Sequence, residues 1–222
     1  MVIIFDVDGT LVDSVKAHAA AWQQVFREFG FDFSFDRIRG QIGKGSDELL
    51  KDFLSHEDIE RVGEQIAERR VEIFKEEYMP RIVPFPGIRE LFDRLRHDGH
   101  EIVLGTSAKG EELESYVELI GIEGMTQGQT SADDADRSKP HPDIFQAALA
   151  KVEGAQPEDA LVVGDTPYDM QAARRGGMRG IAVLTGGFTE QQMRDAGCTA
   201  VFADIEAMLQ RYDEIPWSMS KS

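Results

Sequence analysis

The sequence of 222 residues contains a single cysteine, Cys198, so no disulfide can form within the chain. No apolar run approaches the roughly 18 residues that a membrane-spanning helix needs. The short apolar run at the start has no basic flank and is interrupted by aspartates, unlike a signal peptide. These absences predict a cytoplasmic protein.

The sequence is also short of positive charge, with 24 Lys and Arg residues against 41 Asp and Glu residues and a formal net charge of −17. Such a surface repels nucleic-acid phosphates and anionic lipids, so we expect no nucleic acid and no membrane as partners. An anionic substrate would need a metal ion or a few local cations to attract it. We expect a monomer or a weak homodimer.

What the sequence does contain is a regular alternation of short apolar runs and helical patterns. The apolar runs lie at residues 2–5, 101–105, 160–164, 180–184 and, more weakly, 200–203. The helical patterns lie at 88–97, 111–120, 142–152, 168–176 and 205–212. This alternation predicts an α/β fold with a Rossmann-like parallel sheet covered on both faces. Ligands of such sheets bind beyond the carboxyl ends of the strands.

The alternation is interrupted by a helical stretch that contains no convincing strand. Helical patterns occur there at 16–29, 46–54 and 58–78, and a proline-rich joint at 80–87 ends the stretch. The Glu and Arg residues of 58–78 predict a solvated helix face. We therefore predict three parts: an α/β core of residues 1–14 and 85–214, an inserted all-helical cap of residues 15–84, and a C-terminal tail of residues 215–222.

Two aspartates one residue apart, Asp6 and Asp8, end the first apolar run. In an extended backbone both side chains point to the same side, where their charges repel each other. Gly9 permits a sharp turn that brings a ligand close to the backbone. A metal ion between the carboxylates would offset the repulsion. From these residues alone, an acidic turn that merely ends the strand is an equally good explanation.

The stretch Asp6-Val7-Asp8-Gly9-Thr10-Leu11-Val12-Asp13-Ser14 resembles the first motif of the haloacid dehalogenase superfamily of phosphatases and phosphomutases. Three further motifs of that superfamily match in order: Thr106 after an apolar run, Lys139, and Asp165 with Asp169. The resemblance covers at least residues 1–185. The helical insert resembles the cap domain of the phosphoglycolate phosphatase and β-phosphoglucomutase branch.

The resemblance implies a role for each of these residues. Asp6 would be the nucleophile that forms an aspartyl-phosphate, and Asp8 the general acid and base. Mg²⁺ would be held by Asp6, the backbone carbonyl of Asp8 and Asp165, with Asp169 orienting the metal or its waters. The phosphoryl oxygens would be held by Thr106, Ser107 and Lys139.

The insert offers four candidate substrate residues. His18 and Trp22 lie one helical turn apart, and β-phosphoglucomutase is similar here; they form either a pocket wall at a hinge or simply part of the core. Arg39 and Lys44 lie in the glycine-rich loop 39–46, which either reads the substrate or is a simple turn between helices. Three glycines in six residues allow a close approach to another group and favour the substrate-reading role.

The motifs also separate the reactions that this superfamily performs. Haloacid dehalogenases lack the second aspartate, so Asp8 favours phosphoryl transfer. Phosphonatases use a lysine of the cap that forms a Schiff base. Lys44 leaves this reaction possible but does not support it. β-Phosphoglucomutases show a Glu-Asp pair where this chain has Gly164-Asp165. We predict a Mg²⁺-dependent phosphatase of small phosphorylated metabolites; the alternatives are a sugar phosphomutase and a non-catalytic binding protein.

Overall fold

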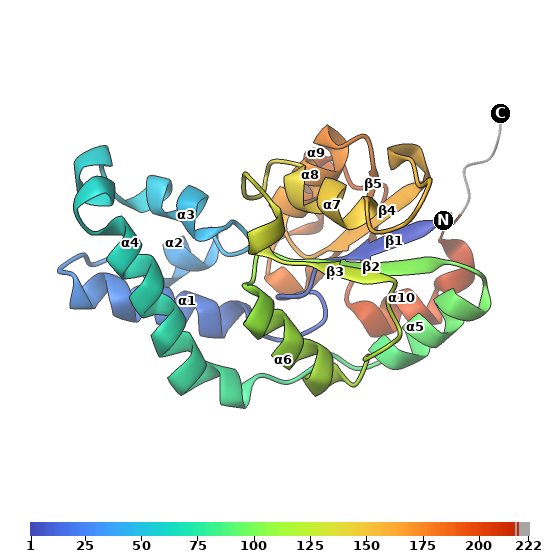
Figure 1. Cartoon of the computed structure of the whole chain (residues 1–222), viewed down its shortest axis with the longest axis horizontal. Helices are drawn as coiled ribbons and strands as arrows, with labels where there is room; N and C mark the ends of the chain where they lie inside the picture. Colours follow the sequence, from blue (N-terminus) through green and yellow to red (C-terminus); the bar gives the residue numbers. More distant parts are fainter. Residues whose placement is uncertain (216, 218–222) are drawn as a thin grey trace.

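The centre of the molecule is a sheet of six parallel strands, seen in the computed structural model, which describes residues 1–215 and 217 (Figure 1). The strands lie in the order β3-β2-β1-β4-β5-β6. Their bounds are β1 Val2–Phe5, β2 Glu101–Gly105, β3 Gly128–Thr130, β4 Ala160–Gly164, β5 Arg179–Val183 and β6 Ala200–Phe202. Since β1 pairs with both β2 and β4, its carboxyl end lies between theirs. The predicted α/β fold with a parallel sheet is confirmed.

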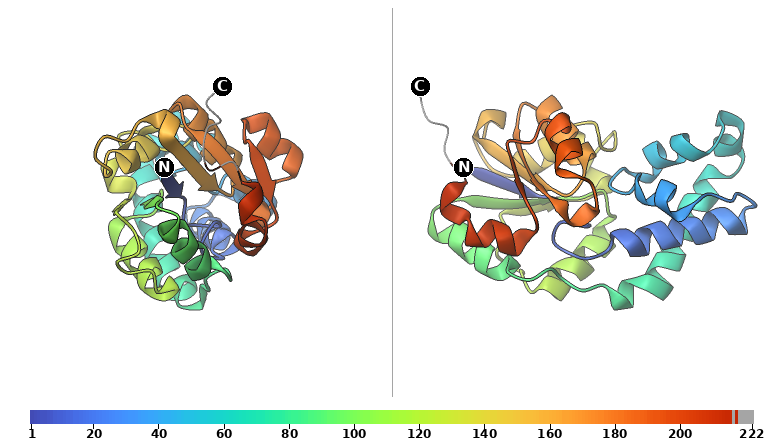
Figure 2. Two further views of the ribbon diagram at one scale, coloured as in Figure 1. Left: turned by 90° about the vertical axis from the view of Figure 1, so that its right-hand side faces the viewer. Right: turned by 180° about the vertical axis from the view of Figure 1, so that it is seen from behind.

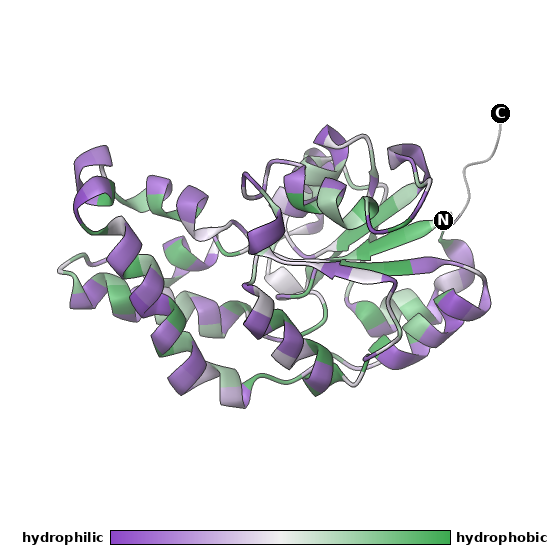
Figure 3. Cartoon of the chain, viewed as in Figure 1, coloured by the Kyte–Doolittle hydropathy of each residue, from purple (hydrophilic) through white to green (hydrophobic). Residues whose placement is uncertain are grey.

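Helices cover both faces of the sheet because successive side chains of each buried strand point to opposite faces. Ile3 and Phe5 pack into one apolar cluster, and Val2 and Ile4 into another on the opposite face. One face carries α5 (Ile88–His97), α6 (Gly110–Ile120) and α10 (Ile205–Gln210); the other carries α7 (Asp143–Leu149), α8 (Pro167–Arg175) and α9 (Glu190–Ala196) (Figures 1 and 2). Most residues of the central strands are hydrophobic, and the outer helices carry many hydrophilic residues (Figure 3).

A group of helices lies at one end of the molecule, beyond the carboxyl ends of the strands (Figure 1, left). It consists of α1 (Val15–Glu28), α2 (Phe35–Arg39), α3 (Ser46–Phe53) and α4 (His56–Ile73), followed by a π-helical turn (Phe74–Tyr78) and a 3-10 turn (Met79–Arg81). The chain enters and leaves this group through two adjacent segments. The Asp13 N–H donates to the Val83 carbonyl oxygen at 2.9 Å, and the Phe85 N–H donates to that of Leu11 at 2.9 Å.

The elements that the sequence did not predict are short. β3 is the three-residue stretch Gly-Gln-Thr, and α2 and α9 have five and seven residues. Within the predicted tail, Ile215 is buried and the Trp217 indole N–H donates to the Tyr212 carbonyl oxygen at 2.9 Å. Apart from these two residues, the predicted tail lies outside the described residues. None of the described helices has the length and apolar character needed to cross a lipid bilayer.

We expect Phe92→Ala to destabilise the protein by about 3–5 kcal/mol, because the side chain is fully buried and leaves a cavity. Its ring packs 4.9 Å from that of Phe5, which directly precedes Asp6. Denaturant titration would measure the loss. Arg96→Ala, on the exposed side of the same helix, is the matched control and should change stability by less than about 0.5 kcal/mol. Equal losses in both variants would contradict this account of the core.

Candidate active site

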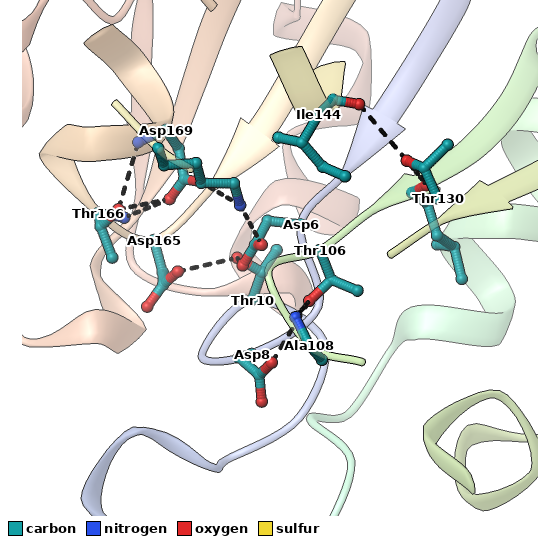
Figure 4. Close-up of polar contacts among 12 residues, drawn as sticks. Asp6, Asp8, Thr10, Thr106, Ala108, Thr130, Ile144, Asp165, Thr166 and Asp169 are labelled. Atoms are coloured by element: carbon teal, nitrogen blue, oxygen red, sulfur yellow. Dashed lines mark hydrogen bonds and ion pairs between the residues drawn. The ribbon is translucent and has the colours of Figure 1, made fainter. Parts of the chain in front are cut away.

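The carboxyl ends of β1, β2 and β4 bring together residues that lie far apart in the sequence (Figure 4). Asp6 and Asp8 follow β1, Thr106 follows β2, and Asp165 follows β4. Gly9 makes this convergence possible. Its φ is +78°, and a Cβ there would lie 2.1 Å from the Asp165 Oδ2 atom, so only glycine fits.

Asp6 is buried, and each of its carboxylate oxygens has a donor. The Lys139 Nζ atom donates to Oδ1 at 2.5 Å and the Thr10 hydroxyl to Oδ2 at 3.2 Å. Its backbone N–H donates to the Val163 carbonyl oxygen, which fixes the residue to β4. Burial raises the pKa of the Asp6 carboxyl to about 7, although the Lys139 ammonium acts to lower it.

Lys139 is fully buried and links Asp6 to Asp169. Its Nζ atom lies 2.8 Å from the Asp169 Oδ1 atom. Burial lowers the pKa of Lys139, but the charges of Asp169 and Asp6 outweigh this effect and raise it above the ordinary value. The Asp169 Oδ2 atom accepts from the Thr166 N–H at 3.0 Å and from its hydroxyl at 2.6 Å, capping α8. Asp169 therefore anchors the lysine to the start of this helix.

A third buried carboxylate, Asp165, completes a donor set that could hold a metal ion. Oxygen atoms of Asp6, Asp165 and Asp169 all lie within 4.8 Å of one another. The Asp165 Oδ1 atom accepts from the Thr10 hydroxyl at 3.2 Å, but its buried Oδ2 atom has no hydrogen-bond partner. Burial and the charges of Asp6 and Asp169 raise the pKa of Asp165 well above its ordinary value. An orphaned carboxylate oxygen beside two other carboxylates fits a hard divalent cation.

Asp8 has a different environment, although only one residue separates it from Asp6. Its Oδ1 atom accepts from the Ser14 hydroxyl at 2.7 Å and lies 2.8 Å from His18 Nε2; its Oδ2 atom accepts from the Thr106 hydroxyl at 3.4 Å. Burial alone would raise the pKa of Asp8. The charge and hydrogen bond of His18, together with the bond from Ser14, outweigh burial and lower the pKa to about 2.

One cavity adjoins Asp6 and Asp8, and a second, larger cavity shares part of its lining with the first. The smaller one, of about 40 Å³, has room for about one water molecule and is lined by both aspartates, His18, Trp22 and Thr106, among other residues. The larger one, of about 260 Å³, lies between the core and the helical group. The residues that line both cavities are Lys44, Arg70, Ser107 and Ala108.

The candidate residues of the insert are placed unequally. His18 contacts Asp8, and Trp22 is buried against the Phe26 ring, at the wall of the smaller cavity. Lys44 lines both cavities and forms an ion pair of 2.5 Å with Asp52. Arg39 is not among the residues that line these cavities; its guanidinium packs against Gly187, where a Cβ would meet Nη1 at 2.1 Å.

Two charged residues at the site were not predicted. Arg70 belongs to the helix predicted as a solvated face, yet its guanidinium lies over the Trp22 ring, 5.3 Å from the ring centroid. The signal was available, because Ile66 and Ile73 are fully buried and Arg70 lies four and three residues from them on the same helix face. Glu112 of α6 is buried beside His18, 3.5 Å from its Nε2 atom. We found no signal for it in the sequence.

Comparison with known proteins agrees with this geometry. Residues 3–183 match the family of haloacid dehalogenase-like hydrolases. The chain belongs to this family. Within it, the chain is 29% identical over 190 residues to a phosphoglycolate phosphatase of Aquifex aeolicus, covering 83% of this chain and 85% of that protein. It is 30% identical over 199 residues to a probable phosphatase, IndB, of Dickeya dadantii, covering 87% and 85%.

A hydrolase of known structure from Pseudomonas syringae has the same fold, with a TM-score of 0.88 and 32% identity over 97% of this chain and 99% of that one. The predicted haloacid dehalogenase-like hydrolase is thereby confirmed. The phosphatase names of the relatives agree with the predicted enzyme class, a phosphoric monoester hydrolase.

The raised pKa of Asp6 makes a prediction about stability in the absence of metal. A carboxyl with a pKa of 3.8 when unfolded and about 7 when folded binds more protons in the folded state. The contribution of Asp6 to the free energy of unfolding is full below about pH 4 and is lost as the pH rises through about 7. Denaturant titrations of the chelated protein should therefore show a smaller loss of stability between pH 5 and pH 8 in Asp6→Asn than in the wild type.

The matched control for this titration is Asp93→Asn, which changes an exposed aspartate of α5. It should retain the pH dependence of the wild type. A wild-type slope that persists in Asp6→Asn would contradict the assignment of this pH dependence to Asp6.

Proposed function

We propose that this protein is a Mg²⁺-dependent phosphatase of small phosphorylated metabolites that forms an aspartyl-phosphate on Asp6. One observation carries the proposal. Asp6 and Asp8 follow the same strand, one residue apart, but their side chains have different partners. Asp6 pairs with Lys139 and belongs to the set of carboxylates that could hold a metal ion. Asp8 lies outside that set and is oriented separately by Ser14 and His18. This division supports a nucleophile beside a separate proton donor.

In the first step, an oxygen of ionised Asp6 attacks phosphorus and the bond from phosphorus to the leaving oxygen breaks. Asp8, which must first take up a proton against its lowered pKa, gives that proton to the leaving oxygen. In the second step, Asp8 takes a proton from water, which attacks phosphorus and releases phosphate and the Asp6 carboxylate. The Thr106 hydroxyl, the Ser107 N–H and the Lys139 ammonium would hold the phosphoryl oxygens. These donors offset the charge that develops there.

The carboxylates of Asp6 and Asp165 and the backbone carbonyl of Asp8 would hold the Mg²⁺ ion. When bound, it offsets the repulsion between the phosphate and Asp6. Asp169 would support this site indirectly, because its oxygens contact Lys139 and cap α8.

The fourth motif favours a phosphatase over a sugar phosphomutase. Gly164 stands where β-phosphoglucomutases have the glutamate of their Glu-Asp pair. A Cβ at this position would lie 2.5 Å from the Asp169 Cβ atom, so a glutamate would displace Asp169. Such a displacement would also move Lys139, which pairs with Asp169.

We further propose that residues 15–84 form a cap over a core of residues 1–14 and 85–214. The 40 Å³ cavity is too small for a phosphate ester, so the cap would open to admit the substrate. The 260 Å³ cavity would hold the remainder of the substrate, with Lys44 and Arg70 facing an anionic group such as the carboxylate of phosphoglycolate. The net charge of −17 supports an enzyme with no nucleic-acid or membrane partner, and we propose a cytoplasmic monomer or weak homodimer.

Phosphate release from p-nitrophenyl phosphate tests the reaction. We expect activity with Mg²⁺, loss of that activity after chelation, and recovery when Mg²⁺ is restored. Asp6→Asn keeps the shape of the side chain but lacks the nucleophilic charge, and should lower turnover by on the order of 10³ or more. Full activity of the chelated enzyme would refute the metal role, and near-normal turnover by Asp6→Asn would refute the covalent mechanism.

Lys44→Ala should lower kcat/KM for phosphoglycolate by roughly 10- to 150-fold, the loss of one charge-assisted contact. p-Nitrophenyl phosphate has no second anionic group and should be affected much less. Arg39→Ala is the matched control, since Arg39 ends α2 at the start of the same loop but lines neither cavity. Equal, small effects of Lys44→Ala on both substrates would show that Lys44 does not read the substrate.

A further inference from the structure

The proposed reaction gives no role to Glu112, a carboxylate buried in the core near Asp8. Glu112 lies in the first turn of α6 and is only 3% exposed, and the same helix buries Leu113 and Tyr116. Burying an ionised carboxylate costs several kcal/mol unless partners satisfy it. The Tyr116 hydroxyl donates to Glu112 Oε1 at 3.2 Å, and His18 Nε2 lies 3.5 Å from the same oxygen.

His18 places one ring nitrogen between two carboxylates. Its Nε2 atom lies 2.8 Å from Asp8 Oδ1 and 3.5 Å from Glu112 Oε1. The Phe74 ring stacks on the imidazole, with centroids 4.0 Å apart and planes 9° apart. This stacking resists rotation of the ring out of its plane, but it permits a small in-plane shift of Nε2 from one carboxylate toward the other.

This arrangement bears on the acid step. While His18 donates to Asp8, the bond stabilises the ionised carboxylate, whereas the leaving oxygen needs a proton from that carboxyl. If Glu112 also accepts from the His18 Nε2–H, the hydrogen bond from His18 to Asp8 is weaker. We propose that Glu112 is a positioning residue that shares the His18 Nε2–H with Asp8 and so leaves the Asp8 carboxyl free to protonate the leaving oxygen.

This inference rests on the proposed phosphatase reaction, and a leaving-group comparison tests it. Phenyl phosphate and p-nitrophenyl phosphate are similar in shape, but phenolate is the more basic leaving group and depends more on the proton from Asp8. Glu112→Leu removes the acceptor at similar volume. It leaves the buried Tyr116 hydroxyl without its Glu112 partner, so the stability of the variant is measured alongside its activity.

We expect Glu112→Leu to lower kcat/KM for phenyl phosphate by roughly 10- to 100-fold, the usual effect of losing a partner that orients a site residue. The loss for p-nitrophenyl phosphate should be at least several-fold smaller. Glu112→Gln keeps an acceptor oxygen and should restore part of the phenyl phosphate activity. The matched control is Glu111→Leu, which removes the neighbouring exposed carboxylate that pairs with Lys75 and should leave the ratio of the two substrates unchanged.

Three outcomes would overturn this role. An equal loss for both substrates would show that Glu112 only supports the structure, and a loss confined to KM would show that it only lines the substrate cavity. Melting curves of each variant distinguish these results from misfolding. If Glu112→Leu is unfolded, the ratio of kcat/KM for phenyl phosphate to that for p-nitrophenyl phosphate is measured in Glu112→Gln instead. Absence of wild-type hydrolysis of either substrate would instead overturn the phosphatase proposal and this inference with it.

Discussion

The burial of three carboxylates around one ammonium group is the constraint on which the rest of this structure depends. Asp6, Asp165, Asp169 and Lys139 are each at most 4% exposed, at the carboxyl ends of β1 and β4. One lysine cannot offset three ionised carboxylates, and each costs several kcal/mol to bury. Without a cation the excess is relieved by protons, because burial and the neighbouring carboxylates raise the pKa of Asp6 and of Asp165. The same excess of negative charge makes the cluster a strong attractor for a divalent cation.

Much of the fold could be predicted from the sequence because parallel strands buried on both faces are continuous apolar runs. β1, β2 and β4 have the predicted bounds, and β5 and β6 differ from prediction by one residue at their ends. β3 could not be found in this way, because an edge strand of Gly128, Gln129 and Thr130 needs no apolar side chains. Its place follows only from its pairing with β2.

The site was predictable to the extent that local sequence determines it. Asp6, Asp8 and Asp165 each follow an apolar strand, so the fold alone carries them to one edge. Arg70 and Glu112 are charged residues on helices, where the ordinary expectation is a solvated face. Glu112 is buried beside His18 of α1, which no local pattern in α6 indicates, whereas the spacing of Ile66 and Ile73 already marks the face of α4 that carries Arg70. Sequence reasoning also assigned equal weight to Arg39 and Lys44, and the structure separates them because the loop turns Arg39 toward Gly187.

The insert contacts the core at two places, the glycine-rich loop and His18. An opening of the proposed cap would affect these two sets of contacts differently. The glycine-rich loop is packed closely: a Cβ at Gly43 would lie 2.6 Å from Thr166, and the Tyr168 hydroxyl donates to the Gly40 carbonyl oxygen at 2.7 Å. His18, in contrast, lies in the first turn of α1, close to the segments that connect the two parts. In a rotation about those segments, atoms near the axis move least. The loop would therefore leave the core first, while the contacts of His18 with Asp8 and Glu112 change by small displacements. Small displacements are sufficient to alter a hydrogen bond shared between two acceptors.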